Sequence, residues 1–174
     1  PFAQKLILVG LTCSPITLHI SDSEGNTTGL DEIGDIQENI PDSQFFVFSH
    51  NEAVFLIKNN DYLVDIKAIE TGTFTLIFKT IDSEGNIINQ IEYRDVPTSK
   101  NGRGEVILNQ ENLKPELSLD VDGNGTSDFN ILPGENPPEE LQNMFVENGD
   151  VNKDKRLDIS DAVAILGHLF LGTE

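Results

Sequence analysis

The stretch YLVDIKAIE, residues 62–70, alternates side chains with a period of two. On one face of the expected strand lie Tyr62, Val64, Ile66, Ala68 and Glu70. On the other, more polar face lie Leu63, Asp65, Lys67 and Ile69. Successive side chains of a β-strand point to opposite faces, so this alternation predicts a half-buried strand.

Other short segments with strand composition surround this stretch, and Gly, Asn and Asp residues separate them. No helical pattern interrupts them before residue 120, so the sequence predicts a mainly β fold, an antiparallel β-sandwich over residues 1–118. Residues 119–174 are expected to form a small appendage of calcium-binding loops and a helix. The further predicted strands are residues 4–10, 15–21, 44–48, 53–58, 73–81, 87–96, 104–109 and 115–119.

The composition restricts the partners of the chain. Its 174 residues contain 30 Asp and Glu against 11 Lys and Arg, a net charge of −19. Such a surface repels phosphate backbones, so nucleic acid is not expected as a partner. No apolar stretch reaches the ~18 residues of a membrane span. Cys13 is the one cysteine, which excludes an internal disulfide, and its apolar neighbours predict a buried, inert thiol.

The pentapeptide DSEGN occurs at residues 22–26 and again at 82–86. Asp22, Glu24 and Asn26 could be read as a metal cluster. A tight hairpin turn is the favoured interpretation, because Gly-Asn supplies the positive-φ residues of such turns and too few ligands follow at loop spacing.

The stretch DVNKDKRLDISD, residues 150–161, has the spacing of a calcium loop. Oxygen ligands are expected at the first, third, fifth, seventh, ninth and twelfth positions, the seventh through its backbone carbonyl. Lys155 replaces the usual glycine at the sixth position. A calcium site is the favoured interpretation, and a solvated charge run is the alternative. The predicted ligands are Asp150, Asn152, Asp154, the carbonyl of Arg156, Asp158 and Asp161.

A second acidic loop begins at residue 120 and has the glycine, Gly125, but no carboxylate at its twelfth position, Ile131. Glu135 or a backbone oxygen would have to substitute there. An Asx-rich turn is the alternative interpretation. The predicted ligands are Asp120, Asp122, Asn124, the carbonyl of Thr126 and Asp128, so two calcium ions are expected in all.

Residues 149–172, GDVNKDKRLDISDAVAILGHLFLG, closely resemble one half of a type I dockerin, the calcium-binding module of cellulosome-type assemblies. They depart from it at Lys155, and no second half is evident. The resemblance implies calcium-dependent docking onto a cohesin-like protein. The residues that it implies for partner contact are Ile159, Ser160, Leu166 and Gly167.

The segments SPITLHISDSEGNTTG (14–29) and LSLDVDGNGTSDF (117–129) are similar to the opening and close of β-sandwich modules appended to secreted bacterial hydrolases. That resemblance implies an extracellular or cell-surface protein. By the same resemblance, any catalytic domain of the parent, such as a polysaccharide or ester hydrolase, is expected upstream of Pro1.

No nucleophile, metalloprotease or phosphate-loop motif supports catalysis in this chain. His19, His50 and His168 each have a structural explanation, so no catalytic residue is predicted. The leading hypothesis is a non-catalytic, calcium-stabilised docking module, and a degenerate hydrolase fragment is the least favoured. A carbohydrate-binding or cell-surface sandwich ranks between them, because the chain has no Trp and its ten Phe residues are expected mostly in the core.

Two helices are predicted in the tail. One begins near Pro138 and ends near residue 147, and the other covers the apolar residues 162–171. The second is expected to pack against the sandwich or against Leu141, Met144 and Phe145 of the first.

Overall fold

The computed structural model describes residues 6–13, 15–31, 33–49, 51–57, 60–109 and 112–146, together with residues 159, 162, 163 and 166. The chain divides into two compact units, residues 1–136 and 137–174.

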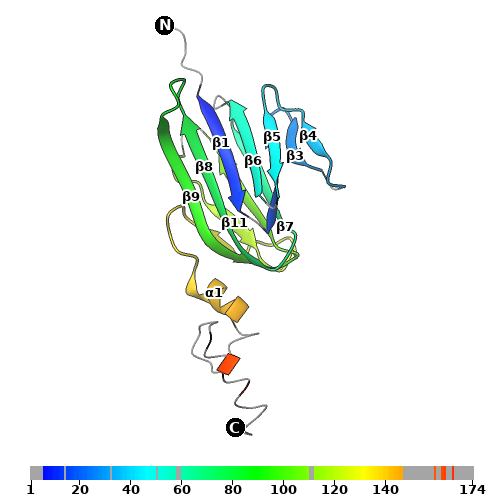
Figure 1. Ribbon diagram of the computed structural model, residues 1–174, viewed down its shortest axis with the longest axis vertical. Helices are drawn as coiled ribbons and strands as arrows, with labels where there is room; N and C mark the ends of the chain where they lie inside the picture. The colour runs from blue at the N-terminus through cyan, green and yellow to red at the C-terminus, as the bar shows by residue number, and fades with distance from the viewer. Residues whose placement is uncertain are drawn as a thin grey trace. The chain divides into compact units, whose positions relative to one another are not determined.

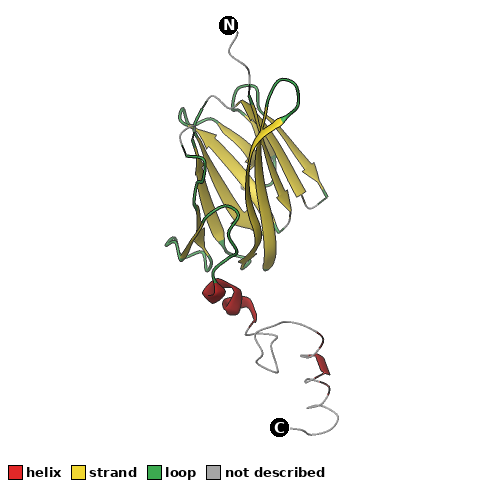
Figure 2. Cartoon of the chain, turned by 90° about the vertical axis from the view of Figure 1, so that its left-hand side faces the viewer, coloured by secondary structure: helices red, strands yellow, loops and turns green. Residues whose placement is uncertain are grey.

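The first unit is a β-sandwich of two antiparallel sheets, as the sequence predicts (Figure 1, Figure 2). Sheet A has the strand order β5-β6-β1-β8-β9, and sheet B has the order β12-β11-β10-β7-β2-β3-β4. The strands are β1 (Ile7–Cys13), β2 (Ile16–Asp22), β3 (Thr27–Leu30), β4 (Ile36–Glu38), β5 (Gln44–Phe48), β6 (Asn51–Ile57), β7 (Tyr62–Ala68), β8 (Gly72–Ile81), β9 (Ile87–Thr98), β10 (Arg103–Leu108), β11 (Leu117–Asp120) and β12 (Phe129–Ile131).

Strand β7 confirms the two-face pattern in the centre of sheet B. Its neighbours are β2 and β10, and Val64 pairs with Ile20 and Val106 on either side. These three side chains are fully buried, whereas Asp65 and Lys67 are exposed. The apolar face of each sheet therefore faces the other sheet, and the hydrophobic effect holds the two layers together.

Three short strands, β3, β4 and β12, are not predicted from the sequence. Each has only three or four residues, and β3 contains Gly29. A Cβ atom at Gly29 would lie 2.3 Å from the carbonyl oxygen of Leu18, and the residue has φ +139°. Only glycine therefore lets β3 approach β2 so closely, although glycine weakens any strand pattern in the sequence.

Both DSEGN segments form the predicted hairpin turns. Asp22 accepts hydrogen bonds at Oδ1 from the backbone N–H groups of Glu24 and Asn26, and the side-chain amide of Asn26 donates to its Oδ2. Asp82 makes the same contacts in the second copy. The carboxylate oxygens are thus engaged by the turn itself, so the segments close hairpins.

Glu52 is a buried carboxylate between the two sheets. It lies on β6 with 4% of its surface exposed, and its Oε2 accepts a 2.7 Å hydrogen bond from the backbone N–H of Leu18 on β2. Its own N–H donates to the hydroxyl of Thr12 at 3.1 Å. Burial raises the pKa of Glu52 to about 7, and the hydrogen bond from Leu18 opposes that rise only in part.

Two sequence predictions about side-chain burial are wrong. Cys13, the last residue of β1, is exposed. Phe46, Phe48 and Phe55 are 39%, 58% and 36% exposed, although the phenylalanines are mostly expected in the core. Period-two alternation assigns side chains to two faces but does not say which faces are covered.

The second unit contains the predicted first helix, α1 (Glu139–Val146), with Glu139 and Glu140 in its first turn. Acidic side chains there interact favourably with the positive end of the helix dipole. In the part of the chain that the structure describes, no helix has the length and apolarity needed to cross a membrane. The predicted helix over residues 162–171 and its packing lie outside the described residues, apart from three isolated positions.

Candidate metal site

The candidate site is the loop that joins β11 to β12 at one end of sheet B. The two strands pair from Leu117↔Ile131 to Leu119↔Phe129, and the chain between them makes a compact turn. Asp120 ends β11, where it pairs with Arg103 on the neighbouring strand β10. The pairing of the strands therefore brings the first and last acidic residues of the loop, Asp120 and Asp128, to the same place.

Two glycines allow this turn. Gly123 has φ +74° and Gly125 has φ +88°, a backbone region that costs other residues about 1–2 kcal/mol. A Cβ atom at Gly123 would also lie 2.4 Å from the carbonyl oxygen of Asn101 in the β9–β10 turn, whereas one at Gly125 would meet nothing within 4 Å. Gly123 is thus needed for close packing as well as for its dihedral angle.

The carboxylate of Asp120 organises the loop. Its Oδ1 accepts hydrogen bonds from the N–H groups of Gly123 and Asn124 at 2.8 and 3.1 Å, and its Oδ2 accepts one from Gly125 at 2.8 Å. Asp120 is 8% exposed. Burial pushes the pKa of Asp120 upward, but these backbone donors outweigh it and hold the pKa below its ordinary value. The side chain is therefore ionised at neutral pH.

Two further acids complete the group. Oxygen atoms of Asp120, Asp122 and Asp128 all lie within 4.8 Å of one another, and the latter two side chains are exposed. Asp122 accepts a 3.0 Å bond from the N–H of Asn124, and Asp128 accepts a 2.9 Å bond from the N–H of Val121. Three carboxylates at this separation repel one another. No ion pair to them occurs among the described residues, so the group could hold a metal ion.

The other predicted ligands of this loop are only partly placed. Asn124 lies inside the turn, and its side-chain oxygen accepts a 2.8 Å bond from the N–H of Thr126. Position twelve, Ile131, is buried in β12 at 2% exposed, so it provides no carboxylate. Glu135, the proposed substitute, does not belong to the group of close carboxylates.

The second predicted calcium loop, residues 150–161, lies outside the described residues, with Ile159 as the exception. The same holds for the predicted partner residues Ser160 and Gly167. The structure describes three residues of this region, and all three side chains are exposed: Ile159 at 79%, Val163 at 61% and Leu166 at 52%.

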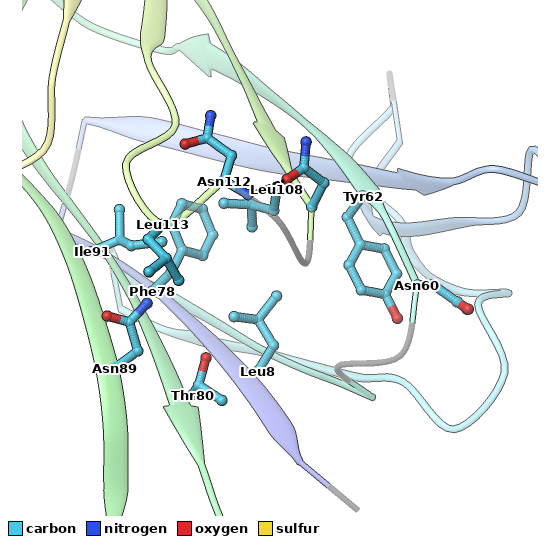
Figure 3. Close-up of a pocket in the computed structure, with 11 residues that line it drawn as sticks. Leu8, Asn60, Tyr62, Phe78, Thr80, Asn89, Ile91, Leu108, Asn112 and Leu113 are labelled. Atoms are coloured by element: carbon cyan, nitrogen blue, oxygen red, sulfur yellow. Dashed lines mark hydrogen bonds between the residues drawn. The ribbon is translucent and has the colours of Figure 1, made fainter.

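A small cavity lies between the two sheets (Figure 3). Its volume is about 20 Å³, roughly the space for one water molecule. Apolar side chains, four amides and the side chains of Tyr62 and Thr80 line it, and its small volume suits a bound water better than a larger ligand. The amides are Asn60, Asn89, Asn109 and Asn112.

Of the three histidines, His19 is the one that lies in the part of the chain that the structure describes. The Nδ1 atom of His19 lies 4.0 Å from an oxygen of Asp65, and both side chains are substantially exposed on sheet B. His50 and His168 lie outside the described residues.

Comparisons of the chain with protein-family models, with curated proteins and with solved structures found no match.

Proposed function

We propose that this chain is a non-catalytic, calcium-stabilised accessory module of an exported protein, with a C-terminal segment that docks on a cohesin-like partner. The observation that carries the calcium part is the convergence of Asp120, Asp122 and Asp128. Calcium is a hard cation that takes six to eight oxygen ligands, and this loop offers carboxylate, amide and carbonyl oxygens at the spacing of the first nine positions of a calcium loop.

A calcium ion in this loop would act on the fold. It would neutralise the repulsion among the three carboxylates and tie the end of β11 to the start of β12. An ion that binds only the native state stabilises it by mass action. Because Ile131 cannot supply the usual bidentate carboxylate, we expect weaker affinity here than at residues 150–161.

Docking is supported by the dockerin resemblance and by the exposure of Ile159 and Leu166. The partner surface would comprise these two residues with Ser160 and Gly167, held by the second calcium ion. A pull-down from extracellular proteins of the source organism, with calcium and with chelator, tests it. Capture of a cohesin-like protein only with calcium supports docking, and capture of nothing in calcium refutes it.

Calorimetric titration of the full chain with calcium tests the two sites. We expect two ions, with Asp122→Ala and Asp150→Ala each removing one and Glu24→Gln, an exposed acid in a hairpin turn, removing none. If Asp122→Ala leaves the stoichiometry unchanged, the 120–128 loop is an Asx-rich turn without metal.

The second candidate is a carbohydrate-binding or cell-surface sandwich in which calcium is purely structural. It is favoured by one observation, the exposed aromatic side chains on β5 and β6.

A further inference from the structure

Three phenylalanines on the outer face of sheet A form an exposed aromatic cluster, Phe46, Phe48 and Phe55. The rings of Phe46 and Phe48 stack with centroids 6.0 Å apart, and the ring of Phe55 meets Phe46 edge-on at 5.8 Å. Phe45 and Val54, which alternate with them, point inward and are buried. The cluster therefore lies on the side of the sheet away from the core.

Neutral polar groups flank the rings. The strand register sets Gln44 opposite Phe55, Phe46 opposite Ala53, and Asn51 opposite Phe48. The small side chain of Ala53, 5% exposed, lies at the centre of the surface. The surface thus offers apolar rings next to amides that can both donate and accept hydrogen bonds.

The charge of this surface limits what it can bind. β1, β5 and β6 are described along their whole length, and the side chains on their outer face include no Asp, Glu, Lys or Arg. The whole chain carries −19. An anionic ligand would be repelled by the surrounding protein, and a cationic ligand would meet no carboxylate on these three strands. On the next strand, β8, the residue opposite Val9 is Lys79, which also disfavours a cation. The surface therefore fits an uncharged ligand best.

The size of the cluster further limits the kind of ligand that it can bind. At exposures of 39%, 58% and 36%, the three rings offer on the order of 300 Å² of apolar surface. A stable protein dimer buries about 800 Å² per partner, and a second copy would bring another −19 charge. A narrow, uncharged ligand is therefore favoured over a second copy of this chain.

We infer that the aromatic cluster binds a neutral polysaccharide, with apolar C–H faces of the sugar rings against Phe46 and Phe48 and with hydroxyl groups bonded by Gln44 and Asn51. This inference deepens the second candidate function and does not rest on the calcium site, which lies on sheet B.

The test is retention of the full chain on insoluble neutral polysaccharides, namely microcrystalline cellulose, mannan and chitin, with a covalently cross-linked polygalacturonate gel as the anionic comparison. We expect retention on at least one neutral polymer that persists at high salt, and none on polygalacturonate. The double variant Phe46→Ala/Phe48→Ala should weaken retention at least tenfold. Retention should persist in the presence of chelator, provided that circular dichroism shows intact strands. The outcome of this test therefore does not depend on whether the loop at residues 120–128 binds calcium.

The matched control is Ile107→Ala. Ile107 is 57% exposed, close to the exposure of Phe48, and lines an open groove on the outer face of sheet B. It should leave retention unchanged. Absence of binding to every neutral polymer overturns the inference, as does equal retention of the double variant. Loss of retention in Ile107→Ala alone would place the ligand in the groove. A wild-type dimer in sedimentation that Phe48→Ala dissociates would assign the cluster to self-association.

Discussion

Replacement of Glu52 by Gln should make the protein less sensitive to pH. In the native state the carboxyl of Glu52 is buried and has a pKa of about 7, against an ordinary value of 4.5. The native state therefore binds this proton more tightly than the unfolded chain does. A group whose native pKa is raised contributes fully to stability below the unfolded pKa, and that contribution is lost as pH rises through the native pKa.

The size of the effect follows from this pKa difference. Each pKa unit corresponds to about 1.36 kcal/mol, so ionisation of Glu52 costs at most about 3 kcal/mol of stability between pH 4.5 and pH 8. With a typical urea dependence of about 2 to 3 kcal/mol per molar, the unfolding midpoint should fall by about 1 M across that range.

The assay is urea unfolding followed by circular dichroism from pH 5 to pH 8, at one fixed calcium concentration. The substituted glutamine side chain can still accept the N–H of Leu18 but cannot ionise, so Glu52→Gln should match the wild type near pH 5 and exceed its stability at pH 8. The control is Glu70→Gln, an exposed glutamate, which should follow the wild-type curve. Parallel curves for Glu52→Gln and the wild type would refute the reasoning, because other groups would then set the pH dependence.

Three further predictions concern the backbone and the thiol. Gly29→Ala should destabilise the sandwich by about 3 kcal/mol in urea unfolding, because its Cβ would lie 2.3 Å from a carbonyl oxygen of β2. The control is Gly25→Ala, at positive φ but in open space, which should cost only about 1 kcal/mol. Equal losses of stability in the two variants would contradict the proposed clash. Gly123→Ala should lower calcium affinity in calorimetry more than Gly125→Ala does, since only the former meets the β9–β10 turn; a larger loss at Gly125 would reverse that argument. Cys13 should react with a thiol reagent in the native protein, because it is exposed; labelling that requires urea would show it to be covered.

The sandwich was predictable because period-two alternation is strong where one face of a strand is buried. β7 illustrates this, with Tyr62, Val64, Ile66 and Ala68 buried and the side chains between them wetter. β3 was not predictable, because Gly29 serves a close approach of two backbones that the sequence does not reveal. The hydrophobic pattern reports the burial of side chains, whereas this approach depends on how closely the backbones of two paired strands, β2 and β3, come together in the folded sheet.

Part of the candidate metal site was predictable from the sequence, because it depends on residues that are close together in the chain. The spacing of Asp120, Asp122 and Asp128 depends on local turn geometry, and the three carboxylates meet as the spacing predicts. The spacing does not reveal that Asp120 is engaged by three backbone N–H groups, which hold the shape of the turn. Hydrogen bonds between Asp120 and the backbone restrict the conformations of the loop, so less conformational entropy has to be lost in holding the proposed ion, which favours binding despite the missing twelfth ligand.

The exposure of the aromatic cluster could not be predicted from the alternation of side chains. In QFFVF, residues 44–48, both faces of the strand are apolar, so alternation cannot distinguish the face that meets the core from the face that does not. The distinction comes from the sheet order, in which β5 is an edge strand and its partner β6 buries Val54 and Leu56 against the core. Solvation alone does not explain three aromatic rings gathered on the outer face of an otherwise strongly acidic protein. This contiguous exposed apolar surface is the basis of the proposed binding, and its lack of charge favours neutral ligands over charged ones.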